Sequence, residues 1–304
     1  MRKSLVTGIL AITLLPLAAR AEVPRVVASI QPLHSLAASV MQGVGSPDLV
    51  VTGAQSEHTY TLRPSDARKL ADAQLVVLVD PNYETFVTRA LKDKSASAMV
   101  ALARLPGVRV LPAREGGVWE AEHDEHGHHH EDGNDYHVWL DPTNARLLVS
   151  ALAERLAKLD PEHAERYQAN ADATEERLSA LDMLLKLKLM LVADKPFAVF
   201  HDGYQYLEKR YDLNAVGSVT VDPDRPPSAK RLAALRDRLK ASGTACVFRE
   251  PQFPAPVVHT LAEAAGAREG VLDPQGADIP PGPDLYFTLM TRLSDALASC
   301  LGTK

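Results

Sequence analysis

Four side chains that can bind a metal ion stand where short apolar runs of the sequence begin or end. They are His58, His137, His201 and Asp273. Three neutral imidazoles and one carboxylate suit a tetrahedral zinc site, whereas calcium or manganese would take more oxygen ligands. The four residues are scattered, without a compact HExxH or CxxC motif, and a single histidine is more often a core or surface residue than a ligand. Spacing alone therefore leaves the zinc site a hypothesis.

The elements around these residues predict an α/β fold. Short apolar strands alternate with amphipathic helices, which is typical of mostly parallel sheets flanked by helices. The predicted strands are residues 25–30, 48–52, 75–80, 197–201, 213–219, 246–250 and 270–272. The predicted helices are residues 33–41, 64–73, 203–211, 228–241, 255–265 and 284–300. Because ligands collect at the carboxyl ends of parallel strands, two lobes that face each other would bring the four residues into one cleft.

A long segment without glycine or proline, residues 162–195, separates the two halves. Its apolar residues recur at spacings of three and four, which predicts one long helical face. Residues 178–192 are apolar on more than one face, so we expect this part to be largely buried. We interpret residues 160–195 as a rigid helix that joins an N-terminal lobe, 22–159, to a C-terminal lobe, 196–304. A coiled coil for dimerisation is the alternative.

Residues 115–134 form a low-complexity insertion rich in glycine, histidine and acidic residues. Because the segment has almost no apolar anchors, we expect a mobile loop. Its histidines form a second, weaker candidate metal site: His123, His126, His128, His129 and His130. The loop either collects zinc and passes it to the cleft, or it is a solvated linker that binds metal only at high concentration. The sequence leaves both possibilities open.

The first residues, 1–21, are expected to be a secretory signal peptide. Arg2 and Lys3 precede a mostly apolar run, 5–17, and small residues suit cleavage after Ala21. An uncleaved membrane anchor is the alternative, although the run is shorter than the roughly 20 residues of a membrane span. Loss of three of the 33 basic residues would leave 30 against 39 acidic residues, a net charge of −9. Such a charge argues against a nucleic-acid-binding protein.

The chain has two cysteines, Cys246 and Cys300. Two are too few for a disulfide scaffold or a cysteine-rich zinc fold. In the oxidising compartment that export implies, a pair usually joins, and the bond would tie the last helix to the strand that begins at Cys246. Two free buried thiols are the alternative.

Five stretches of the mature chain resemble the zinc-binding solute-binding proteins of bacterial zinc ABC transporters, the ZnuA-like, cluster A-I metal-binding family. The stretches are EHTYTLRPSDARKLADAQLVV (57–77), DYHVWLDPTNA (135–145), FHDGYQYLEKRYDL (200–213), CVFREPQFPAPVV (246–258) and VLDPQGADI (271–279). The histidine-rich loop and the spacing of the cysteines are also typical of this family. The resemblance implies two α/β lobes joined by one long rigid helix, with Zn(II) in the cleft. It also implies a periplasmic location and an inner-membrane zinc ABC permease as partner.

The resemblance assigns the metal ligands residue by residue. The family's histidine ligands fall on His58, His137 and His201, and its carboxylate falls on Asp273. Glu57 matches an acidic residue that, in this family, stands near the metal or replaces a ligand. Manganese-binding relatives have glutamate at the third position, so His201 favours zinc. The family commonly has Asp-Pro-Leu-Gly around the carboxylate, whereas this chain has Gln275 in place of leucine, and we expect little effect on binding.

The expected function is high-affinity capture of zinc in the periplasm by a monomer. A manganese or iron carrier and a metal-binding adhesin are alternatives on the same fold. An enzyme fits the sequence less well, because four protein ligands close a zinc site to water and no GxSxG elbow or glycine-rich phosphate loop is found. Glu250, at the end of a predicted strand, is expected to hold a metal ligand in place or to form an ion pair between the lobes.

Overall fold

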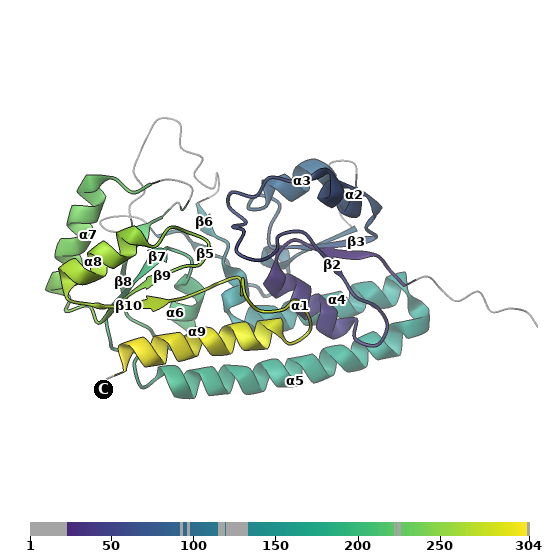
Figure 1. The fold of residues 1–304 in the computed structure, drawn as a ribbon. Coiled ribbons are helices and arrows are strands. Elements are labelled where there is room, and N and C mark those ends of the chain that lie inside the picture. Colours follow the sequence, from purple (N-terminus) through teal and green to yellow (C-terminus); the bar gives the residue numbers. More distant parts are fainter. Residues whose placement is uncertain are drawn as a thin grey trace, which may run out of the picture.

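Two parallel sheets and one long helix form the framework of the computed structural model (Figure 1). The structure describes residues 23–91, 94–95, 98–114, 119, 133–221, 223 and 226–302. The expected signal peptide and nearly all of the histidine-rich loop lie outside these ranges. Among the described residues, we find no helix that is long and apolar enough to cross a membrane.

The first sheet has four parallel strands in the order β2-β1-β3-β4. They are β1 (Val26–Ala28), β2 (Asp48–Leu49), β3 (Leu75–Leu78) and β4 (Met99–Ala101). The helices that follow the first three strands are α1 (Gln31–Val40), α2 (Pro64–Asp72) and α3 (Thr85–Leu91). All four residues of β3 are buried, as expected for a parallel strand whose two faces are both covered.

The second sheet also has four parallel strands, in the order β10-β9-β7-β8. They are β7 (Phe197–His201), β8 (Ala215–Thr220), β9 (Cys246–Arg249) and β10 (Arg268–Val271). The accompanying helices are α6 (Gln205–Tyr211), α7 (Ala229–Ala241), α8 (Pro256–Ala265) and α9 (Leu285–Leu301). The predicted α/β architecture is confirmed, and strand β7 ends at His201 as the sequence indicates.

A short antiparallel pair, β5 (Leu111–Pro112) and β6 (Asn134–Asp135), lies between the two sheets (Figure 1). The histidine-rich segment connects these two strands in the sequence. The chain then passes through a short 3-10 turn, Val138–Leu140, in which all three residues are buried. The base of the loop is therefore held in regular structure next to a buried turn.

Two antiparallel helices, α4 (Pro142–Leu159) and α5 (Ala164–Leu189), connect the sheets. The chain turns at the buried Asp160, whose carboxylate Oδ2 accepts hydrogen bonds from the Tyr167 hydroxyl and the His163 ring, both at 2.8 Å. The long helix thus begins four residues later than the start at 160 that the sequence suggests, and it ends at Leu189. Helix α4 was not among the predicted elements.

The prediction that residues 178–192 are largely buried is wrong for one face of α5. Its inner face is buried, through Leu178, Leu181, Leu185 and Leu189. We call the opposite face, together with the turn that directly follows α5, the outer stripe: Met183, Leu184 and Leu187 lie on the helix, and Met190 and Leu191 lie in the turn. These five side chains are 51–76% exposed. The physical reason is that α1, α4 and α9 pack against α5 from one side, at the edge of the molecule (Figure 1).

Helix α9 joins the two halves of the molecule. It packs against α1 from the first half and against α5 and β10. At its start, the backbone N–H of Tyr286 donates to Ser35 Oγ at 2.9 Å, and the Tyr286 hydroxyl donates to the carbonyl of Trp139 at 2.7 Å. Near its end, Cys300 forms a disulfide bond with Cys246 of β9, which confirms the predicted pair.

Replacing both cysteines with serine should lower the free energy of unfolding by about 2–4 kcal/mol, because the bond closes a long loop of the unfolded chain. Urea unfolding of the metal-free protein measures this loss. The unsubstituted protein in a thiol reductant is the matched comparison and should lose a similar amount. Unchanged stability in both experiments would show that α9 is held by packing alone.

Candidate metal centre

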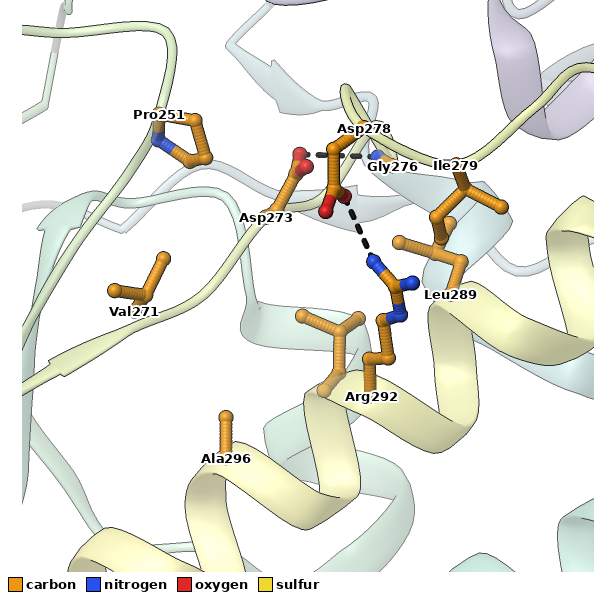
Figure 2. A pocket seen from close by; sticks show the side chains of 10 residues that line it. Pro251, Val271, Asp273, Gly276, Asp278, Ile279, Leu289, Arg292 and Ala296 are labelled. Atoms are coloured by element: carbon orange, nitrogen blue, oxygen red, sulfur yellow. Dashed lines mark hydrogen bonds and ion pairs between the residues drawn. The ribbon is translucent and has the colours of Figure 1, made fainter.

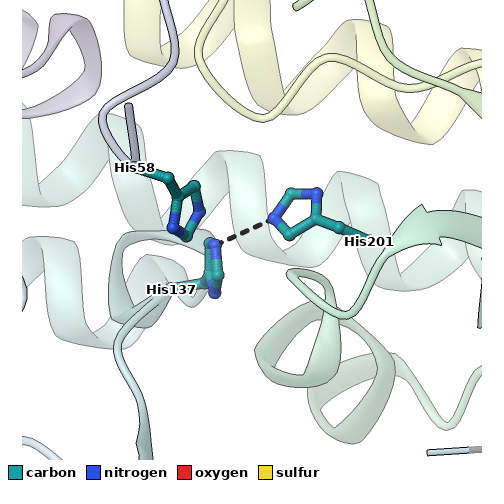
Figure 3. Close-up of side chains that lie close together, drawn as sticks. All are labelled: His58, His137 and His201. Atoms are coloured by element: carbon teal, nitrogen blue, oxygen red, sulfur yellow. Dashed lines mark hydrogen bonds between the residues drawn. The ribbon is translucent and has the colours of Figure 1, made fainter. Parts of the chain in front are cut away.

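Three imidazoles from distant parts of the chain converge between the two sheets (Figure 3). One ligand nitrogen from each of His58, His137 and His201 lies within 4.8 Å of the others. His58 lies in the loop between β2 and α2, His137 directly precedes the 3-10 turn, and His201 is the last residue of β7. The Nε2 atoms of His137 and His201 are 3.0 Å apart. The two nitrogens share a hydrogen bond at this distance (Figure 3), which a cation bound by both would replace.

Buried carboxylates hold two of these rings from behind. His137 Nδ1 lies 2.8 Å from Asp135 Oδ1, and His201 Nδ1 lies 2.7 Å from Glu250 Oε1. A carboxylate that accepts a hydrogen bond from Nδ1–H favours the neutral tautomer in which Nε2 carries the lone pair. This arrangement is typical of histidines that bind metals. The expectation that Glu250 holds a ligand in place agrees with this contact.

The same contacts set the charge states of the pairs. Burial alone would raise the pKa of Asp135, but hydrogen bonds from His137 outweigh it and hold the pKa below its usual value. Burial lowers the pKa of His201, but the charge and hydrogen bond of Glu250 outweigh it and raise the pKa above 6.5. Because a protonated imidazole cannot bind a metal, protons would compete with any metal ion for His201.

Glu57 lies next to the first of the three histidines. Its Oε1 atom is 3.9 Å from His58 Nε2 and accepts a hydrogen bond from the Tyr83 hydroxyl at 2.9 Å. Burial raises the pKa of Tyr83 well above 10, so the phenol stays a neutral donor. Glu57 is only 4% exposed. A carboxylate thus stands at the edge of the imidazole cluster, where it can add an oxygen ligand.

Asp273 lies outside the group of three imidazoles. Its carboxylate accepts hydrogen bonds from Gln252 Nε2 at 2.8 Å and from three backbone N–H groups of its own loop, at residues 275–277. It also lines a pocket between its loop and α9, where Asp278 pairs with Arg292 at 2.8 Å (Figure 2). The structure therefore shows an aspartate engaged with its own loop, and its role as a ligand stays a prediction.

Gly203 approaches the imidazoles closely enough that a side chain there would enter the centre. A Cβ atom at this position would lie 2.3 Å from His201 Nε2 and 3.0 Å from His137 Nε2. The space in front of both Nε2 atoms therefore depends on glycine. Sequence reasoning missed this residue, as it missed Tyr83 and Asp135. Only Asp135, two residues before His137, gives a local signal, because a short turn can bring a carboxylate back to Nδ1.

Ion pairs and hydrogen bonds join the β5–β6 pair to α6 beside the centre. Arg114 donates to Glu208 at 2.6 Å and also pairs with Asp202, the residue after His201. The Tyr206 hydroxyl donates to the carbonyl of Asp135 at 2.6 Å. Burial raises the pKa of Glu208 to about 7, against the opposing effect of Arg114. The five loop histidines, 123 to 130, lie outside the described residues.

Comparisons with known proteins point to the same kind of site. The family model for the periplasmic component A of a zinc-uptake complex, ZnuA, matches residues 26–300. The chain is 43% identical over 306 residues to the high-affinity zinc uptake system protein ZnuA of Brucella abortus, and the alignment covers 91% of each chain. A crystal structure of ZnuA matches with a TM-score of 0.77 at 25% identity, covering 92% of this chain and 100% of the other. A laminin-binding adhesin from Streptococcus agalactiae matches with a TM-score of 0.77 at 22% identity, covering 91% and 99%, which shows the fold alone.

Replacing Gly203 with alanine should weaken zinc binding by roughly 100-fold or more, because the loss of a mere supporting contact already costs about 10–100-fold. The added methyl group would occupy the space in front of two imidazoles. Zinc affinity from chelator competition measures the loss. The metal-free variant should unfold at the same temperature as the unsubstituted protein, and zinc should no longer raise that temperature. Unchanged zinc affinity would place the bound ion elsewhere.

Proposed function

This chain belongs to the ZnuA family of periplasmic zinc-uptake components, and we propose that it captures Zn(II) between its two lobes and delivers the ion to an inner-membrane ABC permease. The family consists of solute-binding transport proteins, so zinc is the cargo of this protein. The observation that carries the proposal is the convergence of three imidazoles within 4.8 Å.

The Nε2 atoms of His58, His137 and His201 are the proposed zinc ligands. Neutral imidazoles suit zinc, and the rings of His137 and His201 are already held by Asp135 and Glu250. Little ordering is therefore needed when the ion arrives. Such a preformed site is compatible with nanomolar affinity, about −12 kcal/mol.

The fourth ligand is proposed to be Glu57, with Asp273 as the alternative that the family resemblance favours. Glu57 Oε1 is already 3.9 Å from His58 Nε2. Asp273 would first have to leave the backbone N–H groups of its own loop. The contacts of the described residues therefore favour Glu57. A site closed by four protein ligands leaves no open position for a reactive water, which supports binding over catalysis.

A manganese or iron carrier and a metal-binding adhesin remain the alternative functions. Imidazole at all three histidine positions favours zinc over manganese, which prefers oxygen ligands. The likeness to the laminin-binding adhesin concerns the fold and does not favour adhesion. We propose transport as the function, since the relative at 43% identity is named for zinc uptake.

ZnuA proteins are periplasmic, and we propose that residues 1–21 direct this chain there and are removed after Ala21. The disulfide between Cys246 and Cys300 fits an oxidising compartment. N-terminal sequencing of the exported protein tests the cleavage position.

We expect one tightly bound zinc per mature chain, retained after deletion of residues 117–134. Alanine at His58, His137 or His201 should weaken zinc binding by more than about 100-fold, because removing a residue that only hydrogen-bonds to a metal ligand already lowers metal affinity by about 10–100-fold. Chelator competition measures both the number of tightly bound zinc ions per chain and the zinc affinity. His259→Ala is the matched control, since this side chain is 71% exposed and pairs with Glu269 at the surface. Loss of tight binding upon deletion of the loop would overturn the cleft site in favour of a histidine-loop metal buffer.

Zinc binding should weaken as the pH falls through the pKa of His201, which Glu250 holds above 6.5. In Glu250→Gln the imidazole stays buried but loses the carboxylate, so its pKa should fall. Zinc release should then begin at a lower pH, while affinity at pH 8 drops by about 10–100-fold. Glu269→Gln on β10 is the matched control and should change neither quantity. If zinc release from Glu250→Gln begins at the same pH as in the unsubstituted protein, Glu250 does not affect the competition between protons and zinc.

A further inference from the structure

The outer stripe of α5 is an apolar surface that zinc capture does not explain. Its five side chains are 51–76% exposed; three lie on the face of α5 opposite the buried leucines, and Met190 and Leu191 follow in the turn at the end of the helix, where Met190 keeps helical backbone angles. A helix that is apolar on both faces is normally covered on both. In Figure 1, α5 runs along the edge of the molecule, on the side away from α2 and α3. A partner on this face would leave the metal centre accessible.

The stripe is symmetric about Leu187. Its other members precede and follow Leu187 by three and four residues: Leu184 and Met183 on one side, Met190 and Leu191 on the other. When two copies of such a stripe pair antiparallel around a two-fold axis, Leu187 meets its own copy. Met183 then faces Leu191 of the second copy, and Leu184 faces Met190. Self-complementary surfaces of this kind are what two-fold dimers use.

The charges beside the stripe favour a protein partner over a lipid surface. Helices that lie on membranes carry an excess of lysine and arginine around their apolar face. Here Lys188 forms an ion pair with Asp295 of α9, and Asp182 on the same helix pairs with Arg210. The whole chain carries a net charge of −6. Lys186 is the other lysine beside Leu187, and by itself it would attract an anionic bilayer only weakly.

The size of the stripe sets the strength of the association. Patches larger than about 400 Å² usually mark a binding surface, and a stable dimer buries about 800 Å² on each partner. Five side chains of this exposure offer roughly 600 Å², between the two values. The resulting dimer should be weak, with a dissociation constant on the order of 0.1 mM.

We propose that the outer stripe of α5 pairs two copies of this protein into an antiparallel, two-fold dimer centred on Leu187. The dimer departs from the monomer that the sequence suggests. It also differs from a coiled coil along the whole helix, because the stripe is confined to the last turns of α5 and the turn that follows them.

Sedimentation of the mature protein over a range of concentrations tests the association. Leu187→Glu places two negative charges on the two-fold axis and should weaken the dimer by at least about 10-fold, as loss of a central contact does. Ala169→Glu is the matched control, because position 169 is exposed and lies on the same face, 18 residues or five helical turns earlier. Both variants should bind zinc normally. Absence of association at millimolar concentration, or equal association in Leu187→Glu, would overturn the proposal.

Disulfide trapping tests the geometry, since the two native cysteines are already joined to each other. Leu187→Cys should cross-link to its own copy much faster than Ala169→Cys. A mixture of Met183→Cys and Leu191→Cys chains should form the mixed dimer, whereas Met183→Cys alone should not cross-link. Faster cross-linking of Met183→Cys to itself would overturn the antiparallel arrangement. Binding to vesicles of phosphatidylethanolamine and phosphatidylglycerol that Leu187→Glu abolishes would identify a lipid surface instead.

Discussion

Two buried carboxylates, Asp135 and Glu250, hold the Nδ1 atoms of His137 and His201 and so aim the Nε2 atoms at one point. A buried carboxylate is costly unless it is paired and hydrogen-bonded, and each of these two has an imidazole as its partner. Asp135 also accepts from Gln205 Nε2 at 3.1 Å, which ties it to the second half of the chain. The proposed metal ligands, the carboxylates that hold their rings and the elements that carry both are therefore one connected arrangement.

Contacts of α1 and α9 hold the first half of the chain at a fixed distance from the loop that contains Asp273. Tyr286 at the start of α9 donates to Trp139, whose own indole N–H donates to Pro274 O at 3.0 Å. Gln31 of α1 donates to the carbonyl groups of Gln275 and Gly276. The first half of the chain is thus bonded directly to the loop that contains Asp273. Such a frame favours local rearrangement of ligand loops over a wide hinge motion when zinc enters or leaves.

Much of this fold could be predicted from the sequence, because short continuous apolar runs such as 75–78 and 197–201 indicate buried parallel strands. The disulfide followed from export and from the presence of only two cysteines. Other features depend on tertiary contacts that no local pattern encodes. The exposure of Leu187 depends on how many helices pack against α5, and the turn at Asp160 depends on a tyrosine seven residues later. The meeting of His58, His137 and His201 was inferred through a family resemblance, since their spacing alone is uninformative, and Gly203 and Tyr83 gave no sign of their places beside them.

The antiparallel closure of β5 on β6 has a consequence for how this protein can change. Hydrogen bonds from Tyr206 and Gln205 fix the strands from outside, so the base of the insertion is anchored independently of what lies between its ends. Insertions and deletions between those ends can therefore accumulate without moving Asp135 or His137. The base of the insertion is in this sense a grafting point, at which a peptide of different length could be presented beside the three imidazoles.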